Sequence, residues 1–600
     1  MQLVRRFRLH ALFCALAVLF CALISRPYAS MGVCDDGPYI LMAQHLARTG
    51  HVAYNGWASP MMLWQFYLGA AFVKLFAFGF TTVRMSTLLV AVVTAWLLER
   101  TLVLAGINEH NATLGTLAFV LSPLYLQLSV TYMNDIFGLL AVVICLYGCL
   151  RALQSAAARG EAGDPGVSRD RATIFWLSFA VVTNAVFGTA RQIAWLGILV
   201  MVPSTLYLLG WHGLSAWQDG LRGRKSVLIA GAAATLAGAG FIVACMQWFK
   251  RQPYVIPEHF SIHGGGGVNV LATFFHASLE LPFLLLPIVV LFLPELRRDV
   301  RRSVKVGSAA FLAYIVMLLI LYVGHAMIRP VLEPAMRDWV TRRGVGPAYL
   351  DAGRPPVFLG RFARLVLTAA SIGGLLGLIV SLARPRREAP GVGDRRPLPW
   401  RQLCILLGPF AVAYALILAS PGSSAGGIPD RYLLELLAVA LPPVVRLYQE
   451  QIRVRTPGVA LLPVAVAATY GVVMVHNMFS LDRARVRLAA ELHAQGVPDT
   501  AVDNGWEQNF VTEIRFSGHI NDPRIQTPPR AYVPVPALGN GPCPGFWFSR
   551  TPHVHPSYAI SFDANACYGP APFTPVHYSR WLASSPGTLY VVRYVPPTRR

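Results

Sequence analysis

Runs of about 20 mostly apolar residues recur along this chain, and each is long enough to cross a bilayer as one helix. Apolar, aromatic and cysteine residues make up 55% of the 600 residues, and charged residues only 13%. An average soluble protein has roughly 25% charged residues, so a water-soluble fold is excluded. The chain is predicted to be a polytopic α-helical membrane protein. About thirteen transmembrane helices are expected, at 9–25, 83–105, 112–130, 136–152, 172–188, 193–211, 226–249, 271–294, 306–328, 361–383, 402–420, 431–449 and 458–480.

Positive charges indicate which loops face the cytoplasm. The net charge is +22, yet a chain so poor in charged residues does not have the composition of a nucleic-acid-binding protein. The segments between spans that fall on one side hold 25 Lys and Arg, whereas those on the other side hold 14 over a greater length. Because cytoplasmic loops are enriched in these residues, the first set, which includes 295–305 and 384–396, is assigned to the cytoplasm. The N-terminus is then cytoplasmic and the C-terminus extracytoplasmic.

The segment 61–80 is long enough to be a further span, but it contains Gln65 and Lys74 and is rich in aromatic residues. Counting it as a span would reverse the side of every later loop. It is therefore predicted to be an amphipathic helix on the membrane surface, within a first outer loop at 26–82. The first apolar run could instead be a cleaved signal peptide, and the loop after it is extracytoplasmic in either case.

Residues 481–600 contain no apolar run long enough to span a membrane. They are expected to form a soluble extracytoplasmic C-terminal domain of α/β type, after a membrane domain at 1–480. The alternating segment 588–595 predicts a strand. Cys543 and Cys567 would share an oxidising compartment, so they are candidates for a disulfide, with two unpaired thiols as the alternative. No Cys or His residues are spaced as zinc ligands.

Three acidic residues are candidates for function because they lie at the outer ends of predicted spans, where acids are scarce. Asp35 and Asp36 follow the first span, and Asp135 lies between the third and fourth. The stretch 35–50 has apolar residues at helical spacing. One of the first two aspartates could therefore be only a helix cap.

The chain from Cys34 to about Leu150 also contains an ordered pattern. Its elements are Asp35 and Asp36, Tyr39, a helix ending at Gly50, Tyr54-Asn55-Gly56, the helix 61–80, Arg84 and Asp135. This order resembles the N-terminal catalytic region of the GT-C glycosyltransferases that use polyprenyl-phosphate sugars. That class includes the protein O-mannosyltransferases and the lipid A aminoarabinose transferases. The resemblance implies a GT-C fold with an interfacial helix in the first outer loop and an outer C-terminal domain.

The chain departs from that pattern at two places. The family often has an Arg where this chain has Pro38, and commonly two prolines and a basic residue where this chain has the segment 57–62. Contacts to the donor phosphate must then come from elsewhere. His259 and His263, on another outer loop, are candidates for substrate contact, as is Tyr39.

Two arginines are candidates for binding the donor phosphate. Arg191 lies between the fifth and sixth spans, where the family often has a basic residue, and Arg431 opens the twelfth span on the same side. The planar fork of an arginine suits a phosphate diester. The alternatives are a headgroup anchor for Arg191, and for Arg431 an ion pair with Glu435 or Asp430.

Together these features predict a membrane glycosyltransferase that moves a sugar from a polyprenyl-phosphate donor to an extracytoplasmic lipid, protein or cell-envelope glycan. Asp35 is the predicted general base, Asp36 and Asp135 orient the acceptor, and the arginines stabilise the leaving phosphate. The resemblance implies inversion at the anomeric carbon. The expected location is a bacterial inner membrane, in contact with lipid. No cofactor is expected, although the three aspartates are ligands of the type that bind a divalent cation. A transporter or flippase of a lipid-linked substrate is the alternative.

Overall fold

The computed structural model describes most of the chain and covers every candidate residue except the two histidines. The described residues are 2–157, 167–210, 225–256, 267–323, 339–346, 350, 352–384, 398–418, 429–535, 542–543, 545 and 547–596. His259 and His263 therefore lie outside the described residues.

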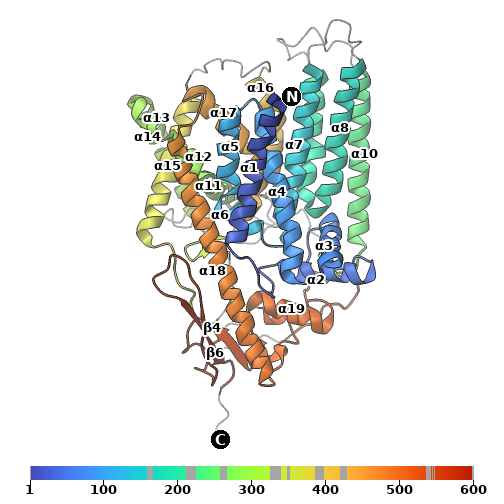
Figure 1. Cartoon of the computed structure of the whole chain (residues 1–600), viewed down its shortest axis with the longest axis vertical. Coiled ribbons are helices and arrows are strands. Elements are labelled where there is room, and N and C mark those ends of the chain that lie inside the picture. Colours follow the sequence, from blue (N-terminus) through green and yellow to red (C-terminus); the bar gives the residue numbers. More distant parts are fainter. Residues whose placement is uncertain are drawn as a thin grey trace.

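A helical bundle makes up most of the molecule (Figure 1). Its helices are α1 (Gln2–Ile24), α4 (Phe80–Leu104), α5 (Glu109–Val120), α6 (Pro123–Leu128), α7 (Asp135–Ala157), α8 (Val167–Phe187), α9 (Val202–Gly210), α10 (Lys225–Lys250), α11 (Gly267–Leu284), α12 (Leu286–Val289), α13 (Pro294–Arg298), α14 (Val300–Val323), α15 (Arg361–Leu382), α16 (Trp400–Leu418), α17 (Leu434–Gln451) and α18 (Leu461–Ala494). Within the described ranges, ten helices are long and apolar enough to cross a membrane, or eleven if the bent pair Ala277–Leu284 and Leu286–Arg298 is one span. The chain is a multi-pass membrane protein, as predicted.

The run predicted at 9–25 lies within α1, a helix of 23 residues. Another predicted span is not a single helix. The run at 112–130 is broken into α5 and α6. Ser122 caps α6 by accepting a hydrogen bond from the backbone NH of Tyr125, and Pro123 occupies its first turn. A capping serine followed by proline begins a new helix, which is why the apolar run does not continue as one.

The segment predicted to lie on the membrane surface contains α3 (Leu63–Phe76), a helix of 14 residues. Gln65 and Phe66 are buried on one face, whereas Tyr67, Leu75 and Phe76 are exposed. Gln65 Nε2 donates to the carbonyl of Tyr132 at 3.0 Å. Too short to cross a bilayer, α3 packs beside α2 (Asp36–Thr49) and fixes the loop that precedes α7.

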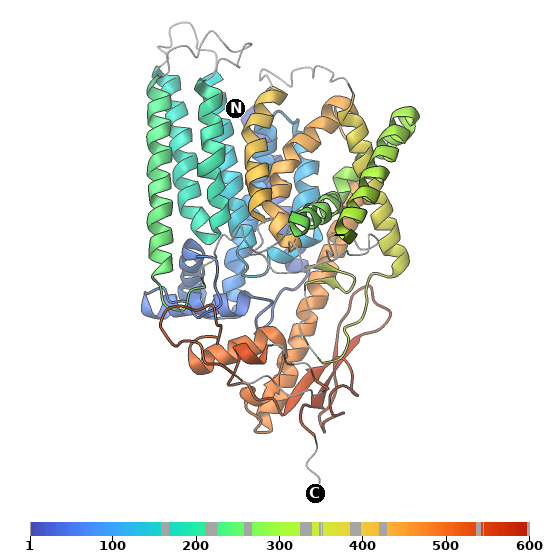
Figure 2. The same cartoon turned by 180° about the vertical axis from the view of Figure 1, so that it is seen from behind.

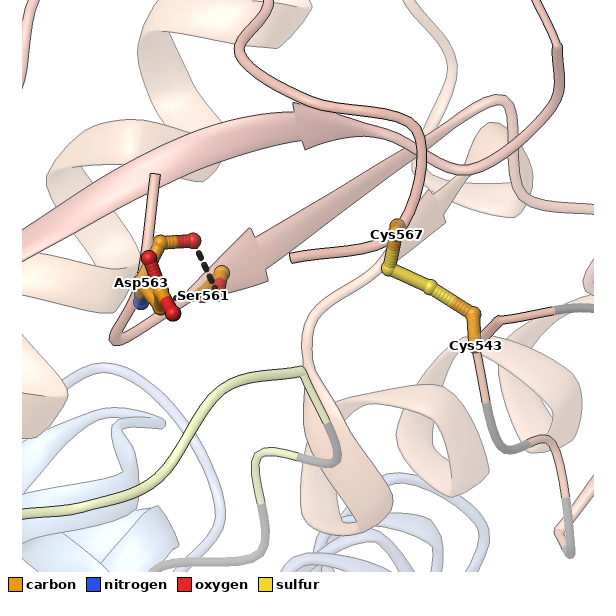
Figure 3. The surroundings of a disulfide bond; sticks show 4 residues. All are labelled: Cys543, Ser561, Asp563 and Cys567. Carbon is orange, nitrogen blue, oxygen red and sulfur yellow. Dashed lines mark hydrogen bonds between the residues drawn. A yellow bond between two sulfur atoms is a disulfide. The ribbon is translucent and has the colours of Figure 1, made fainter. Parts of the chain in front are cut away.

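The C-terminal region combines helices with a small sheet. It contains β3 (Val502–Asp503), α19 (Gly505–Ser517), β4 (Tyr558–Ser561), β5 (Val576–Tyr578) and β6 (Gly587–Arg593). The sheet order is β3-β4-β6-β5, with β3 parallel to β4 and the other pairs antiparallel. The strand predicted at 588–595 is thus β6. A disulfide joins Cys543 to Cys567, the predicted pair, beside the turn at which Ser561 Oγ donates to the carbonyl of Asp563 (Figure 3).

The boundary predicted at residue 480 falls within α18, which continues without a break to Ala494. Leu481, Leu488 and Leu492 of its final turns pack against Ile560 and Leu589 of the sheet. The last span and the C-terminal region are therefore joined by one rigid helix. Figures 1 and 2 place the N-terminus and the C-terminal region at opposite ends of the bundle, as an odd number of crossings requires.

Short elements complete the described fold. They are the helical turns η1 (Gly188–Ala190), η2 (Gln192–Trp195), η3 (Gly197–Met201), η5 (Val290–Phe292), η6 (Asp430–Leu433), η7 (Gly458–Ala460), η8 (Asp499–Ala501) and η9 (Phe548–Arg550), and the hairpin of β1 (Val340–Thr341) and β2 (Gly344–Val345). Three of these elements, η1, η2 and η6, place the candidate arginines.

Candidate active site

Asp35 and Arg431 form an ion pair between two elements that are far apart in the sequence. Both terminal nitrogens of the Arg431 guanidinium donate to Asp35 Oδ2, each at 3.3 Å. The side chains are 18% and 12% exposed, so the pair is accessible but largely covered. Asp35 occupies the N-cap position of α2 and yet makes no side-chain capping hydrogen bond in the described structure. The helix-cap alternative therefore does not account for this carboxylate.

Asp36 lies in a different environment, although it is the adjacent residue. It is fully buried, and Arg84 of α4 donates to both of its oxygens, at 2.8 Å from Nε and 3.1 Å from Nη2. The backbone NH groups of Val33 and Tyr132 also donate to it, at 2.7 and 3.1 Å. Four donors around one carboxylate join the loop before α2 to α4 and to the loop before α7.

Asp135 belongs to a second ionic cluster, which is buried. Arg191 Nη1 lies 2.7 Å from Asp135 Oδ1 and 3.0 Å from Glu435 Oε1. Tyr414 Oη lies 2.8 Å from the other oxygen of Glu435 and donates to it. Asp135 Oδ2 accepts no hydrogen bond from any residue that the structure describes. One arginine thus serves two carboxylates, and one carboxylate oxygen is left to accept a further donor.

A break between α8 and α9 places Arg191. The chain leaves α8 through η1, adopts an extended conformation at Arg191 and re-enters helix through η2 and η3. Asn184 of α8 holds this break: its amide donates to the carbonyls of Ala141 and Ala194 at 2.9 and 3.0 Å, and its oxygen accepts from Ile198 NH at 3.1 Å. Short 3₁₀ and π segments of this kind are frequent at functional sites.

Aromatic rings and a buried aspartate surround Arg431. Its guanidinium lies 5.4 Å from the Tyr432 ring centre and 5.7 Å from that of Trp339, distances that suit cation–π contacts. Asp430 accepts hydrogen bonds from the backbone NH groups of Trp339 and Val340, which secures the β1–β2 hairpin beside the arginine. The arginine is therefore enclosed by rigid groups rather than extended into solvent.

Burial and charge both act on the ionisable groups of the loop. Burial raises the pKa of Asp35, the guanidinium of Arg431 opposes this rise, and the negative charge of Asp135 adds to it. Burial alone would lower the pKa of Arg191, but the carboxylates of Glu435 and Asp135 raise it, so this arginine stays charged. Burial likewise raises the pKa of Tyr39, on which the charges of Asp35 and Arg431 also act. A carboxylate with a raised pKa is a stronger base than an exposed one.

The structure brings the predicted aspartates and arginines together at one end of the bundle. Tyr39 lies beside them, and Glu435 joins them as a residue that the sequence suggested only as a partner of Arg431. Its actual partner is Arg191. Trp339 and Tyr432 were not predicted, because no local pattern indicates that a distant aromatic ring will face an arginine. Among the described residues, no three His, Cys, Asp or Glu side chains are grouped so that they could hold a metal ion.

No family model and no curated protein matches the sequence. Solved structures similar to this chain include ArnT from Cupriavidus metallidurans bound to undecaprenyl phosphate, with 15% identity and a TM-score of 0.40 over 97% of each chain. The apo state of the same protein has 14% identity and a TM-score of 0.35 over 84% of this chain and 83% of that chain. The oligosaccharyltransferase AglB from Archaeoglobus fulgidus, in complex with an inhibitory peptide and a dolichol-phosphate, has 13% identity and a TM-score of 0.37 over 81% and 58%. These neighbours are GT-C glycosyltransferases, the class that the sequence pattern resembles.

Proposed function

We propose that this protein is a membrane glycosyltransferase that transfers a sugar from a polyprenyl-phosphate donor to an acceptor hydroxyl on the extracytoplasmic side. The observation that carries the proposal is the accessible pair of Asp35 and Arg431, with its 3.3 Å contacts, next to the buried cluster of Arg191, Asp135 and Glu435. The ordered sequence pattern from Cys34 to about Leu150 supports the same reaction. A bacterial inner membrane is the proposed location.

The Asp35–Arg431 contact suggests how a donor engages the site. A phosphate diester forms two parallel hydrogen bonds with an arginine fork, and is a better match for it than one carboxylate oxygen. Arg431 therefore transfers its hydrogen bonds from Asp35 to the donor phosphate, and this leaves the Asp35 carboxylate available to a second ligand. Trp339 and Tyr432 keep the guanidinium in place during the exchange.

The reaction is a single displacement. The acceptor oxygen attacks the anomeric carbon, its proton passes to Asp35, and the bond between that carbon and the phosphate oxygen breaks. The bonding electrons leave with the polyprenyl phosphate, so the configuration at the anomeric carbon is inverted. Arg431 and Arg191 stabilise the charge that develops on the leaving phosphate. Polyprenyl phosphate, a phosphate monoester, leaves as a weakly basic anion, so a general acid is dispensable.

The other two aspartates support this chemistry without abstracting the proton. Both oxygens of Asp36 are occupied by Arg84 and two backbone NH groups, so we assign it to positioning the loop. Asp135 orients Arg191 with one oxygen, and we assign its second oxygen, which has no hydrogen-bond partner among the described residues, to the acceptor. The acceptor is a lipid, a protein or a cell-envelope glycan.

Asp35→Asn tests the assignment of the base. The variant retains the shape of the side chain but cannot take a proton, so we expect transfer of radiolabelled sugar from a polyprenyl-phosphate donor to fall by about 100-fold or more. Asp299→Asn is the matched control, because Asp299 forms an Asp–Arg pair with Arg302 at 3.6 Å outside this site.

Both variants should insert into the membrane in the same amount as the wild-type protein, and the control should retain full activity. Retained turnover in Asp35→Asn would move the base to Asp135 or Asp36. An intact lipid-linked sugar that changes leaflet, without release of sugar from the lipid, would identify a flippase instead.

A further inference from the structure

The loop that carries Asp35 touches the C-terminal region at a point with no spare volume. A Cβ built on Gly37 would lie 2.7 Å from Cγ2 of Val511 on α19 and 3.3 Å from the Cα of Gly32. A Cβ built on Gly32 would in turn lie 2.9 Å from the Cα of Gly37. Distances below 3.0 Å essentially never occur for real Cβ atoms. The first turn of α2 approaches α19 this closely because residue 37 is glycine, and the preceding loop packs against that turn because residue 32 is glycine.

The opposite side of the loop is also held. Asp36, the neighbour of Gly37, is bound by Arg84 of α4, whose guanidinium lies 5.4 Å from the ring centre of Phe479 on α18. Asp35 is therefore the partly exposed residue of a segment that is held between α4 and α19. Its carboxylate position depends on both contacts.

A buried polar network fixes α19 to the bundle. Arg485 of α18 lies 3.2 Å from Asp482 and 2.9 Å from Glu507 of α19, and it donates to the side-chain oxygen of Asn504 at 3.2 Å. All four side chains are buried. Because α18 is continuous from the bundle into the C-terminal region, this network fixes the position of α19 relative to the membrane-spanning helices.

Apolar contacts hold the rest of the first outer loop against α19. Trp57 lies 4.4 Å from Phe510 and 5.5 Å from Trp506, measured between ring centres. The NH of Ile520, just after α19, donates to the carbonyl of Asn55 at 3.0 Å, and the Asn55 amide donates to the carbonyl of Pro38 at 3.0 Å. The start of α2 is thus held against α19 and against the residues that follow it.

We propose that Val511 on α19 is a positioning residue for catalysis, which sets the location of the Asp35 carboxylate by its contact with Gly37. The inference rests on the proposed function, since it assumes that Asp35 takes the acceptor proton. The C-terminal region then controls the rate of the chemical step although Val511 touches neither substrate. A displacement of about 1 Å in a reacting group can lower the rate by about 100-fold. Loss of the contact between Val511 and Gly37 is therefore expected to lower kcat strongly.

The test is a pair of variants in the full-length protein. Gly37→Ala forces the loop away from α19, and we expect kcat to fall by about 100-fold while KM for the donor changes little. Adding Val511→Ala to the same chain removes the Cγ atoms that cause the clash, so kcat should recover to within about 10-fold of wild type. A purely structural role of α19 would lower the amount of folded protein without this rescue.

Gly115→Ala is the matched control. A Cβ on Gly115 of α5 would lie 2.9 Å from Cγ2 of Val445 on α17, which is a glycine–valine contact of the same kind. Val445 is ten residues beyond Glu435 on α17, or about 15 Å along the helix from the site. We expect the control to lower the thermal unfolding midpoint without lowering kcat. An equal loss of kcat in the control would overturn the inference, as would wild-type kcat in Gly37→Ala or an absence of rescue by Val511→Ala.

A second measurement separates this inference from the proposed function. Cys34 is buried directly before Asp35, so its labelling by a small maleimide, followed by mass spectrometry of its peptide, reports loop position without any turnover. We expect labelling to increase in Gly37→Ala and to return to the wild-type level with Val511→Ala. A wild-type protein that transfers no sugar would refute the proposed function, yet this labelling pattern would still support the contact between α19 and the loop. Unchanged labelling in Gly37→Ala would overturn that contact.

Discussion

At the scale of single residues, the sequence indicates candidate side chains but does not indicate which residues they contact. Asp35 and Arg431 are 396 residues apart, and no local spacing indicates that they meet. The four-residue spacing of Arg431 and Glu435 suggested a helical ion pair instead. Arg431 lies in η6, a 3₁₀ turn, where residues four apart do not share a face. Glu435 is then directed to Arg191, so the two arginines serve different carboxylates.

The pair of Asp35 and Arg431 predicts a specific pH dependence. The positive charge of Arg431 opposes the rise that burial causes in the pKa of Asp35. Replacing Arg431 with Gln removes this opposition, so the pKa of Asp35 rises further. Because a base acts only when deprotonated, we expect the acid limb of the kcat/KM profile, which reports the free enzyme, to move to higher pH.

Arg431→Lys is the control for charge. It keeps a positive group near Asp35, so its acid limb should move less than that of Arg431→Gln, although its lysine cannot form the two-bond contact with phosphate. An acid limb at the same pH in all three proteins would show that Asp35 does not set the pH dependence.

At the scale of elements, long apolar runs predict helices well because bilayer thickness sets their length. Breaks within an apolar run depend on individual polar side chains and prolines, which an average of hydropathy over the run does not detect. Ser122 and Pro123 divide one run, and Asn184 stabilises the break that carries Arg191. The helix that contains the last predicted span also extends beyond the apolar run, because α18 continues to Ala494 and packs against the sheet. The positions of such breaks are therefore the part of the fold that is hardest to predict from the sequence.

The break at 188–201 predicts a link between Asn184 and donor binding. Asn184→Leu has a similar volume but leaves the NH of Ile198 and the carbonyl of Ala194 without their present partner, at a cost of about 1–3 kcal/mol in the free energy of unfolding. The displaced break moves Arg191, so we expect KM for the donor to rise. Thermal unfolding and initial-rate kinetics measure the two effects.

Asn477→Leu provides the comparison for Asn184→Leu. Asn477 of α18 also bridges two chain segments, since it accepts from Trp581 NH at 2.7 Å and donates to the Trp581 carbonyl at 3.3 Å, away from the ionic clusters. It should lose a similar amount of stability and keep the wild-type KM. Parallel changes of KM in both variants would indicate a general loss of structure rather than a specific role for the break.

At the scale of the whole molecule, the C-terminal region lies opposite the N-terminus (Figure 2). The site borders this region, because Gly37, two residues after Asp35, lies against Val511 of α19. From the charge distribution we propose that this end of the molecule lies outside the cytoplasm, where disulfides persist. We therefore expect peptide mapping of membranes prepared with an alkylating agent and without reductant to recover Cys543 linked to Cys567, while Cys404 of α16 is recovered as a free thiol. A fusion of alkaline phosphatase after the C-terminus should be active, and a fluorescent protein fused before the N-terminus should fold. Free thiols at both positions, together with an inactive phosphatase, would place the site in the cytoplasm, and the donor would then have to carry its sugar on that leaflet.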